Sequence, residues 1–66
     1  MRIIYIGCRN APTRGFAVHT CGESEELGEV HEVDANGRGQ RIITLPMTRA
    51  VEMMFMLRDE VDAANM

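Results

Sequence analysis

Hydrophobic and polar positions alternate along the first part of this chain, as they do in β-strands. The segment from Arg2 to Cys8 is rich in β-branched side chains and has apolar residues on both faces of the strand that it predicts. A second alternating segment runs from Phe16 to Cys21. Pro12 and Gly15 lie between the two segments and favour a turn. This pattern predicts a β-hairpin.

A second hairpin is predicted from Glu29–Asp34 and Gln40–Leu45, on either side of Asn36-Gly37. Asn-Gly favours a type I′ turn, because both central residues of that turn need a positive φ. With the turn at these residues, one oppositely charged pair and one aliphatic pair face each other across the strands: Glu32 with Arg41, and Val30 with Ile43.

After Pro46, the spacing of apolar residues changes to that of a helix. Pro46 itself suits the first turn of a helix, because no amide hydrogen is needed there. The residues from Met47 to about Ala64 are good helix formers without internal glycine or proline. At about 100° per residue, Met56 points nearly away from the apolar side of this helix and Phe55 lies on its flank. Apolar residues at spacings of three and four form one predicted stripe: Met47, Ala50, Met54, Leu57, Val61 and Ala64.

These elements predict a single α+β domain over residues 1–66. Residues 1–45 form a small four-stranded antiparallel sheet made of two hairpins, and residues 46–65 form a C-terminal α-helix packed on one face. One helix covers one face only, so the other face of the first strand stays exposed, and the outer helix residues add to the apolar surface. We therefore expect that a second copy in a homodimer, or a larger partner protein, covers four exposed residues: Ile3, Tyr5, Phe55 and Met56.

Length and composition narrow the function classes. The 66 residues allow one small domain and exclude a two-domain enzyme. Two cysteines cannot form a disulfide scaffold. The first residues lack the apolar core of a signal peptide, and no stretch approaches the roughly 20 apolar residues of a membrane span. We expect a cytoplasmic protein with reduced thiols and no contact with a membrane.

Charge is segregated along the chain. The net charge is −3, from ten acidic residues and seven basic residues, all of them arginine. This balance argues against direct binding of nucleic acid, which normally uses a basic face. Twelve consecutive residues hold six carboxylates and no arginine, and we name this set the acidic segment: Glu23, Glu25, Glu26, Glu29, Glu32 and Asp34. Two interpretations remain open, a solubilising surface and a binding surface for a basic site on a partner protein.

Four side chains of metal-ligand type occur without a familiar zinc spacing: Cys8, His19, Cys21 and His31. In a hairpin that turns near Pro12, the two cysteines lie at opposite ends. The chain has no Cys-x-x-Cys motif, and neither cysteine precedes a helix N-terminus that would lower a thiol pKa. We therefore predict no catalytic residue, no metal and no cofactor, and keep a metal-dependent fold as a third interpretation that elemental analysis would test.

The run Val33-Asp34-Ala35-Asn36-Gly37-Arg38, followed by Leu45-Pro46 and Arg49, resembles the hairpin of swapped-hairpin transition-state regulators. Here several extra residues separate Arg38 from Pro46. The run covers less than a third of the chain and consists of common turn residues, so it does not decide the function. A small dimeric DNA-binding regulator or antitoxin-like protein is the second interpretation, with four arginines as phosphate contacts: Arg9, Arg14, Arg38 and Arg41.

The first interpretation is a small acidic, non-enzymatic interaction protein. It binds a larger protein with a basic surface, one that itself binds nucleic acid, and inhibits or modulates it. Phage and accessory inhibitors, including anti-CRISPR-like proteins, are the class that small size, acidity and the lack of a catalytic motif indicate.

Overall fold

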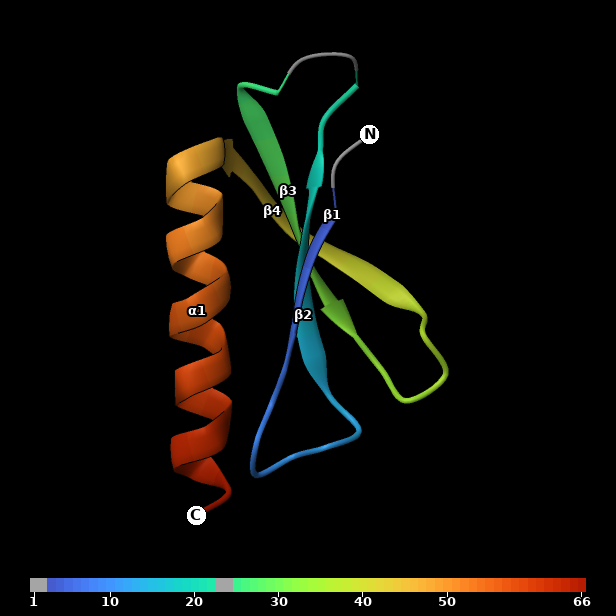
Figure 1. Cartoon of the computed structure of the whole chain (residues 1–66), viewed down its shortest axis with the longest axis vertical. Coiled ribbons are helices and arrows are strands. Elements are labelled where there is room, and N and C mark those ends of the chain that lie inside the picture. Colours follow the sequence, from blue (N-terminus) through green and yellow to red (C-terminus); the bar gives the residue numbers. More distant parts are fainter. Residues whose placement is uncertain (1–2, 23–24) are drawn as a thin grey trace.

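The structure, a computed structural model, describes residues 3–22 and 25–66 and confirms the α+β architecture (Figure 1). The helix α1 (Met47–Ala64) follows the sheet and packs against one of its faces. The predicted strand start at Arg2 lies outside the described residues. Four strands form one antiparallel sheet in the order of the chain: β1 (Ile3–Gly7), β2 (Gly15–Thr20), β3 (Leu27–Val33) and β4 (Gly39–Pro46).

The core lies between α1 and the two central strands. Val18 of β2 pairs with Val30 of β3, and both side chains are buried against Ala50 and Met54 of the helix. Gly28 allows a close approach of α1 to the sheet, because a Cβ at this position would lie 2.9 Å from both the Ala50 Cβ and the Val18 Cγ1. The helix therefore begins directly above a strand position that has no side chain.

The predicted helical stripe is confirmed at most of its positions. Ala50 and Met54 are fully buried, and three further stripe residues pack against the core. Val51 and Met53 also reach the core, so the contact side of α1 is wider than predicted. Ala64 is exposed, and its assignment to the stripe is wrong: the last turn of the helix extends past the ends of the strands (Figure 1).

The turn between β3 and β4 differs from the predicted type I′ turn. The Gly37 amide donates to the Asp34 carbonyl, and the Asp34 amide donates to the Arg38 carbonyl. Ala35 and Asn36 are therefore the central residues, and Gly37 alone in this turn has a positive φ, of 77°. The Asp34 carboxylate stabilises the loop by accepting hydrogen bonds from the amides of Asn36 and Arg38. Because glycine takes up the left-handed conformation after the turn, Asn36 does not need it.

The predicted pairing of Glu32 with Arg41 is wrong, whereas the pairing of Val30 with Ile43 is confirmed. The register shifts between Val30 and His31, so that Arg41 lies opposite His31 and Glu32 lies opposite Gln40. Ile42 is the extra residue of a β-bulge in β4. A bulge places two residues of one strand opposite one residue of its neighbour, and every pair beyond it moves by one position.

Candidate interaction surface

The acidic segment does not form one continuous surface in the described residues. Because side chains alternate along a strand, Glu29 lies on the face of β3 that α1 leaves uncovered, and Glu32 lies on the helix side. Glu25 and Glu26 are exposed and precede β3, and Asp34 follows it at the other end. Glu23 lies outside the described residues. The structure thus separates these carboxylates by face and by strand end.

The contacts of Glu32, Asp34 and Glu29 show how carboxylates of the acidic segment are used within the protein. Glu32 accepts a 2.7 Å hydrogen bond from Arg14 Nη2. The two side chains form an ion pair that is partly exposed to solvent, and such a pair contributes about 0–1 kcal/mol to the stability of a protein. Asp34 caps the β3–β4 turn, as described above. Glu29 Oε1 lies 3.2 Å from His31 Nε2. Glu25, Glu26 and Asp34 are the exposed members among the described residues, and Glu25 and Glu26 also lie beside the exposed Leu27.

Glu29 belongs to a polar cluster on the uncovered sheet face. The hydrogen bond from His31 holds the pKa of Glu29 below its ordinary value, and the Cys21 thiol and the Arg41 charge act in the same direction. The His31 ring stacks on the His19 ring, with centroids 4.3 Å apart. Sequence reasoning missed this stack, because it depends on the pairing of β2 with β3 that places His31 opposite Ala17 and diagonally beside His19.

The two cysteines are free thiols in different surroundings. Cys8 is buried where the β1–β2 loop begins, and burial, with a smaller effect from the charge of Asp62, raises its pKa. Cys21 follows β2 at the other end of the hairpin and is partly exposed. Within residues 3–22 and 25–66, no three His, Cys, Asp or Glu side chains are arranged to hold a metal ion.

The four residues predicted for self-association are all exposed, but they lie on two layers of the molecule. Ile3 and Tyr5 project from β1 on the uncovered sheet face, opposite to the side on which Ile4 and Ile6 pack. Phe55 lies on the flank of α1, and Met56 lies on the outer surface of the helix. A single contact patch therefore does not contain all four residues.

The Tyr5 ring lies over glycine rather than over the outer edge of the sheet. A Cβ added to Gly15, which lies diagonally across from Tyr5 in β2, would overlap with the Tyr5 ring, and one added to Gly7 would lie 3.6 Å from the Tyr5 hydroxyl. Tyr5 nevertheless keeps 57% of its surface exposed. The ring covers the paired side of β1 and leaves the unpaired side accessible.

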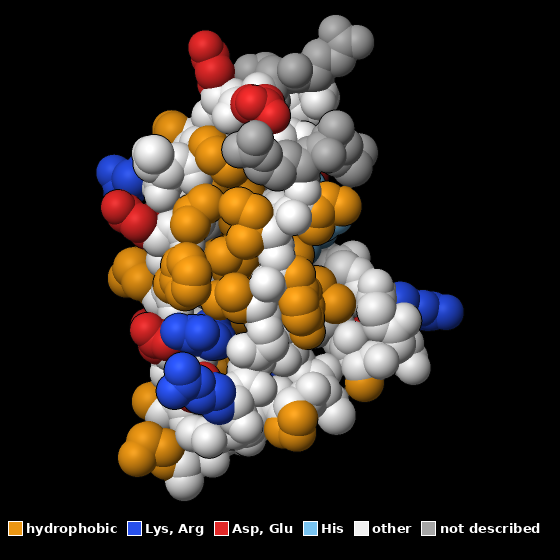
Figure 2. All heavy atoms as spheres, in the orientation of Figure 1, with side chains coloured by type: hydrophobic (Ala, Val, Ile, Leu, Met, Phe, Trp, Pro, Cys, Tyr) orange, Lys and Arg blue, Asp and Glu red, His pale blue; other side chains and the backbone are white. Residues whose placement is uncertain are grey.

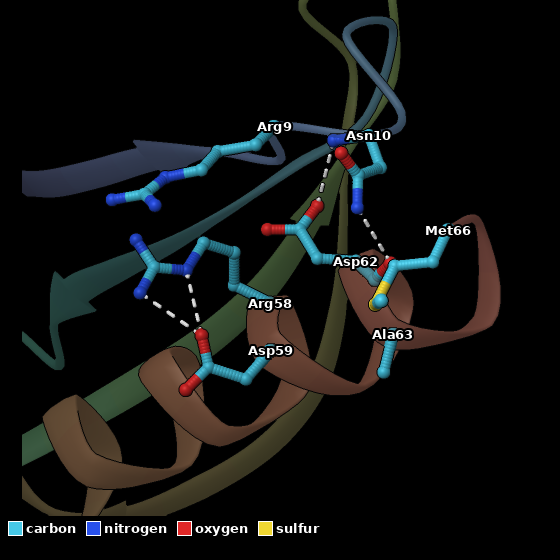
Figure 3. Close-up of a pocket in the computed structure, with 7 residues that line it drawn as sticks. All are labelled: Arg9, Asn10, Arg58, Asp59, Asp62, Ala63 and Met66. Atoms are coloured by element: carbon cyan, nitrogen blue, oxygen red, sulfur yellow. Dashed lines mark hydrogen bonds and ion pairs between the residues drawn. The ribbon is translucent and has the colours of Figure 1, made fainter.

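A shallow hollow of about 490 Å³ lies where the β1–β2 loop meets the C-terminal turns of α1 (Figure 3). Asn10 joins the two segments, because its amide donates to Asp62 Oδ1 at 2.9 Å and its side chain donates to the Asp62 carbonyl at 2.8 Å. Arg58 bonds Asp59 and lies 5.4 Å from the Phe55 ring centroid. In Figure 3 the guanidinium groups of Arg9 and Arg58 extend toward the same side.

Three of the four arginines considered as phosphate contacts lie near carboxylates: Arg14, Arg38 and Arg41. Arg14 is paired with Glu32, and Arg41 contributes to the electrostatic environment of Glu29. Arg38 lies beside carboxylates, in a hollow of about 270 Å³ that Glu32 and Asp34 also line. The acidic neighbours offset the positive charge that binding to a phosphate backbone needs.

No family model, curated protein or solved structure matches the chain. Over the part of the chain that the structure describes, no helix is long and apolar enough to cross a membrane.

Proposed function

We propose that this protein is a non-enzymatic interaction protein that docks on a larger protein with a basic surface and inhibits or modulates it. The observation that carries the proposal is the amount of apolar surface that so small a fold leaves uncovered. Eight large hydrophobic side chains of the described residues are at least 40% exposed. Aromatic and methionine side chains are enriched at protein interfaces, and Tyr5, Phe55 and Met56 are among the eight.

The acidic ends of the sheet support a basic partner. Glu25 and Glu26 precede the exposed Leu27, so charged and apolar contacts are adjacent at the start of β3. Carboxylates around an apolar contact increase the association rate with a basic surface and exclude acidic partners. A basic surface of this kind is typical of a protein that binds nucleic acid, and its occupation would inhibit that protein. We place this activity in the cytoplasm, where Cys8 and Cys21 stay reduced.

A pull-down with matched charge variants tests the proposal. Each immobilised variant is incubated with a lysate of the source cells, and the salt concentration that elutes the retained protein is measured. Glu25→Lys/Glu26→Lys reverses two exposed carboxylates beside Leu27, and Glu52→Lys/Glu60→Lys makes the same charge change on exposed positions of α1. We expect a protein that wild type and the helix variant retain equally, and that elutes from Glu25→Lys/Glu26→Lys at lower salt. Equal retention by all three proteins contradicts the proposal. Circular dichroism confirms that each variant is folded.

A further inference from the structure

Within residues 3–22 and 25–66, β1 has a hydrogen-bonded neighbour on one side only. In Figure 1 it lies at the near edge of the sheet, and β4 forms the opposite edge. We propose that the free edge of β1 pairs antiparallel with β1 of a second copy of this chain, so that two four-stranded sheets join into one. This inference concerns self-association and does not depend on the partner in the proposed function.

The hydrogen bonds of the first hairpin define which backbone groups of β1 are free. The Cys8 amide donates to the Arg14 carbonyl of the β1–β2 loop, and Ile6 and Ile4 lie two and four residues before Cys8, in the same continuous register. Backbone groups of successive strand residues point alternately to the two sides of the strand. Three residues therefore direct both their amide and their carbonyl away from β2: Ile3, Tyr5 and Gly7.

These three positions are self-complementary about a two-fold axis at Tyr5. Two copies of Tyr5 then exchange both backbone hydrogen bonds, as opposed residues of this type do. Ile3 of each copy exchanges its own pair of bonds with Gly7 of the other, which uses the full length of β1. A two-fold contact must place the same surface of both copies together, and this register meets that condition.

The side chains agree with the same register. Ile4 of one copy lies opposite Ile6 of the other, on the face where both residues pack toward the helix. The two Tyr5 residues lie opposite each other on the uncovered face, and because each ring lies over Gly15 of its own β2, neither ring blocks the approach of the second strand. No like charges oppose each other along the paired strands, because Ile3–Gly7 contains no charged residue.

The other free edge of the sheet is protected in three ways that β1 lacks. β4 contains the bulge at Ile42, ends in Pro46, and carries Arg41. Bulges, prolines and charged side chains are the features by which edge strands avoid pairing. β1 is regular over its whole register with β2 and has none of these features. The contrast points to β1 as the pairing edge.

The surroundings of β1 are also apolar. Figure 2 shows hydrophobic side chains gathered over the middle of α1 and the β1 edge, with basic side chains directly below them on the same face. Phe55 lies on the β1 side of the helix, because it is two turns before Asp62, which bonds Asn10 of the β1–β2 loop. Phe55 therefore flanks the new contact, whereas Met56, one residue further around the helix, points away from it.

Light scattering over a micromolar concentration series tests this contact in the full chain. We expect wild type to reach twice the 7.4 kDa monomer mass. Tyr5→Lys places two like charges at the two-fold axis. The variant should therefore associate more weakly, with a dissociation constant at least tenfold higher than that of wild type. Met56→Lys is the matched control, since residue 56 is 58% exposed and residue 5 is 57% exposed, and it should remain dimeric.

A second pair of variants tests the backbone contact if Tyr5→Lys does not fold. Ile3→Pro removes one outward amide at the first residue of β1, a strand position that tolerates proline. Thr44→Pro makes the same change on β4, where Thr44 directs its amide to the outer edge. The inference is supported if Ile3→Pro is monomeric and Thr44→Pro remains dimeric. A monomeric wild type, or a dimer that Met56→Lys or Thr44→Pro dissociates while Tyr5→Lys and Ile3→Pro do not, overturns it.

Discussion

Replacement of Gly28 by alanine tests the packing of the helix on the sheet. The added Cβ would lie 2.9 Å from the Ala50 Cβ, 2.9 Å from the Val18 Cγ1 and 3.1 Å from the Met47 Sδ. Ala50 and Val18 are fully buried, so neither can move aside without displacing other core atoms. Overpacking of this kind costs about 1–3 kcal/mol. In a domain of this size, each kcal/mol lowers Tm by about 4–8 °C.

Gly39→Ala is the matched control for this substitution. A Cβ at Gly39 would lie 3.4 Å from the nearest atom, His31 Nδ1, which is an ordinary contact at an exposed position. Alanine there restricts the unfolded chain and should leave stability unchanged or raise it by about 0.4–1 kcal/mol. Thermal unfolding followed by circular dichroism, at one protein concentration, measures both variants. Equal Tm values for the Gly28→Ala and Gly39→Ala variants would refute the argument.

Two further predictions follow from the titratable groups. The folded pKa of Glu29 is below its ordinary value of 4.5, so its bond with His31 contributes stability that is present above pH 4.5 and lost as the pH falls through the lower folded pKa. Urea midpoints should therefore fall more steeply on acidification in wild type than in Glu29→Gln, and parallel slopes would contradict this. Cys21 should react with an aromatic disulfide reagent faster than Cys8, because Cys8 is buried and its pKa is raised. A single reaction rate for both thiols in the native protein would show that Cys8 is accessible.

The type and order of the strands and the helix could be predicted from the sequence because they depend on local periodicity. The strand bounds differ from the prediction by one or two residues, and β3 begins at Leu27 rather than at Glu29. The alternation of Phe16, Val18 and Thr20 and the helical spacing after Pro46 are properties of short segments. The register between β3 and β4 was not predictable in the same way. Asn36-Gly37 is compatible with more than one turn, and the bulge at Ile42 has no signal in the residues around it.

The candidate site was predictable only in part, because proximity in sequence does not imply a common surface. Alternation along β3 is sufficient to separate Glu29 from Glu32, and the sequence already contained that information. The ion pair of Glu32 with Arg14 depends on how β2 pairs with β3. The residues between these strands carry no turn motif that defines the register, so this partner could be found only in the structure.

Amide hydrogen exchange at Tyr5 tests most directly whether the β1 edge is an interaction surface. We expect the Tyr5 amide to be protected at high protein concentration and to exchange faster on dilution. The Ile4 amide, which is directed toward β2, should stay protected throughout and confirm that the fold is intact. The Thr44 amide, on the outer edge of β4, should exchange fast at every concentration. Fast exchange at both Tyr5 and Thr44 over the whole concentration series would contradict the account.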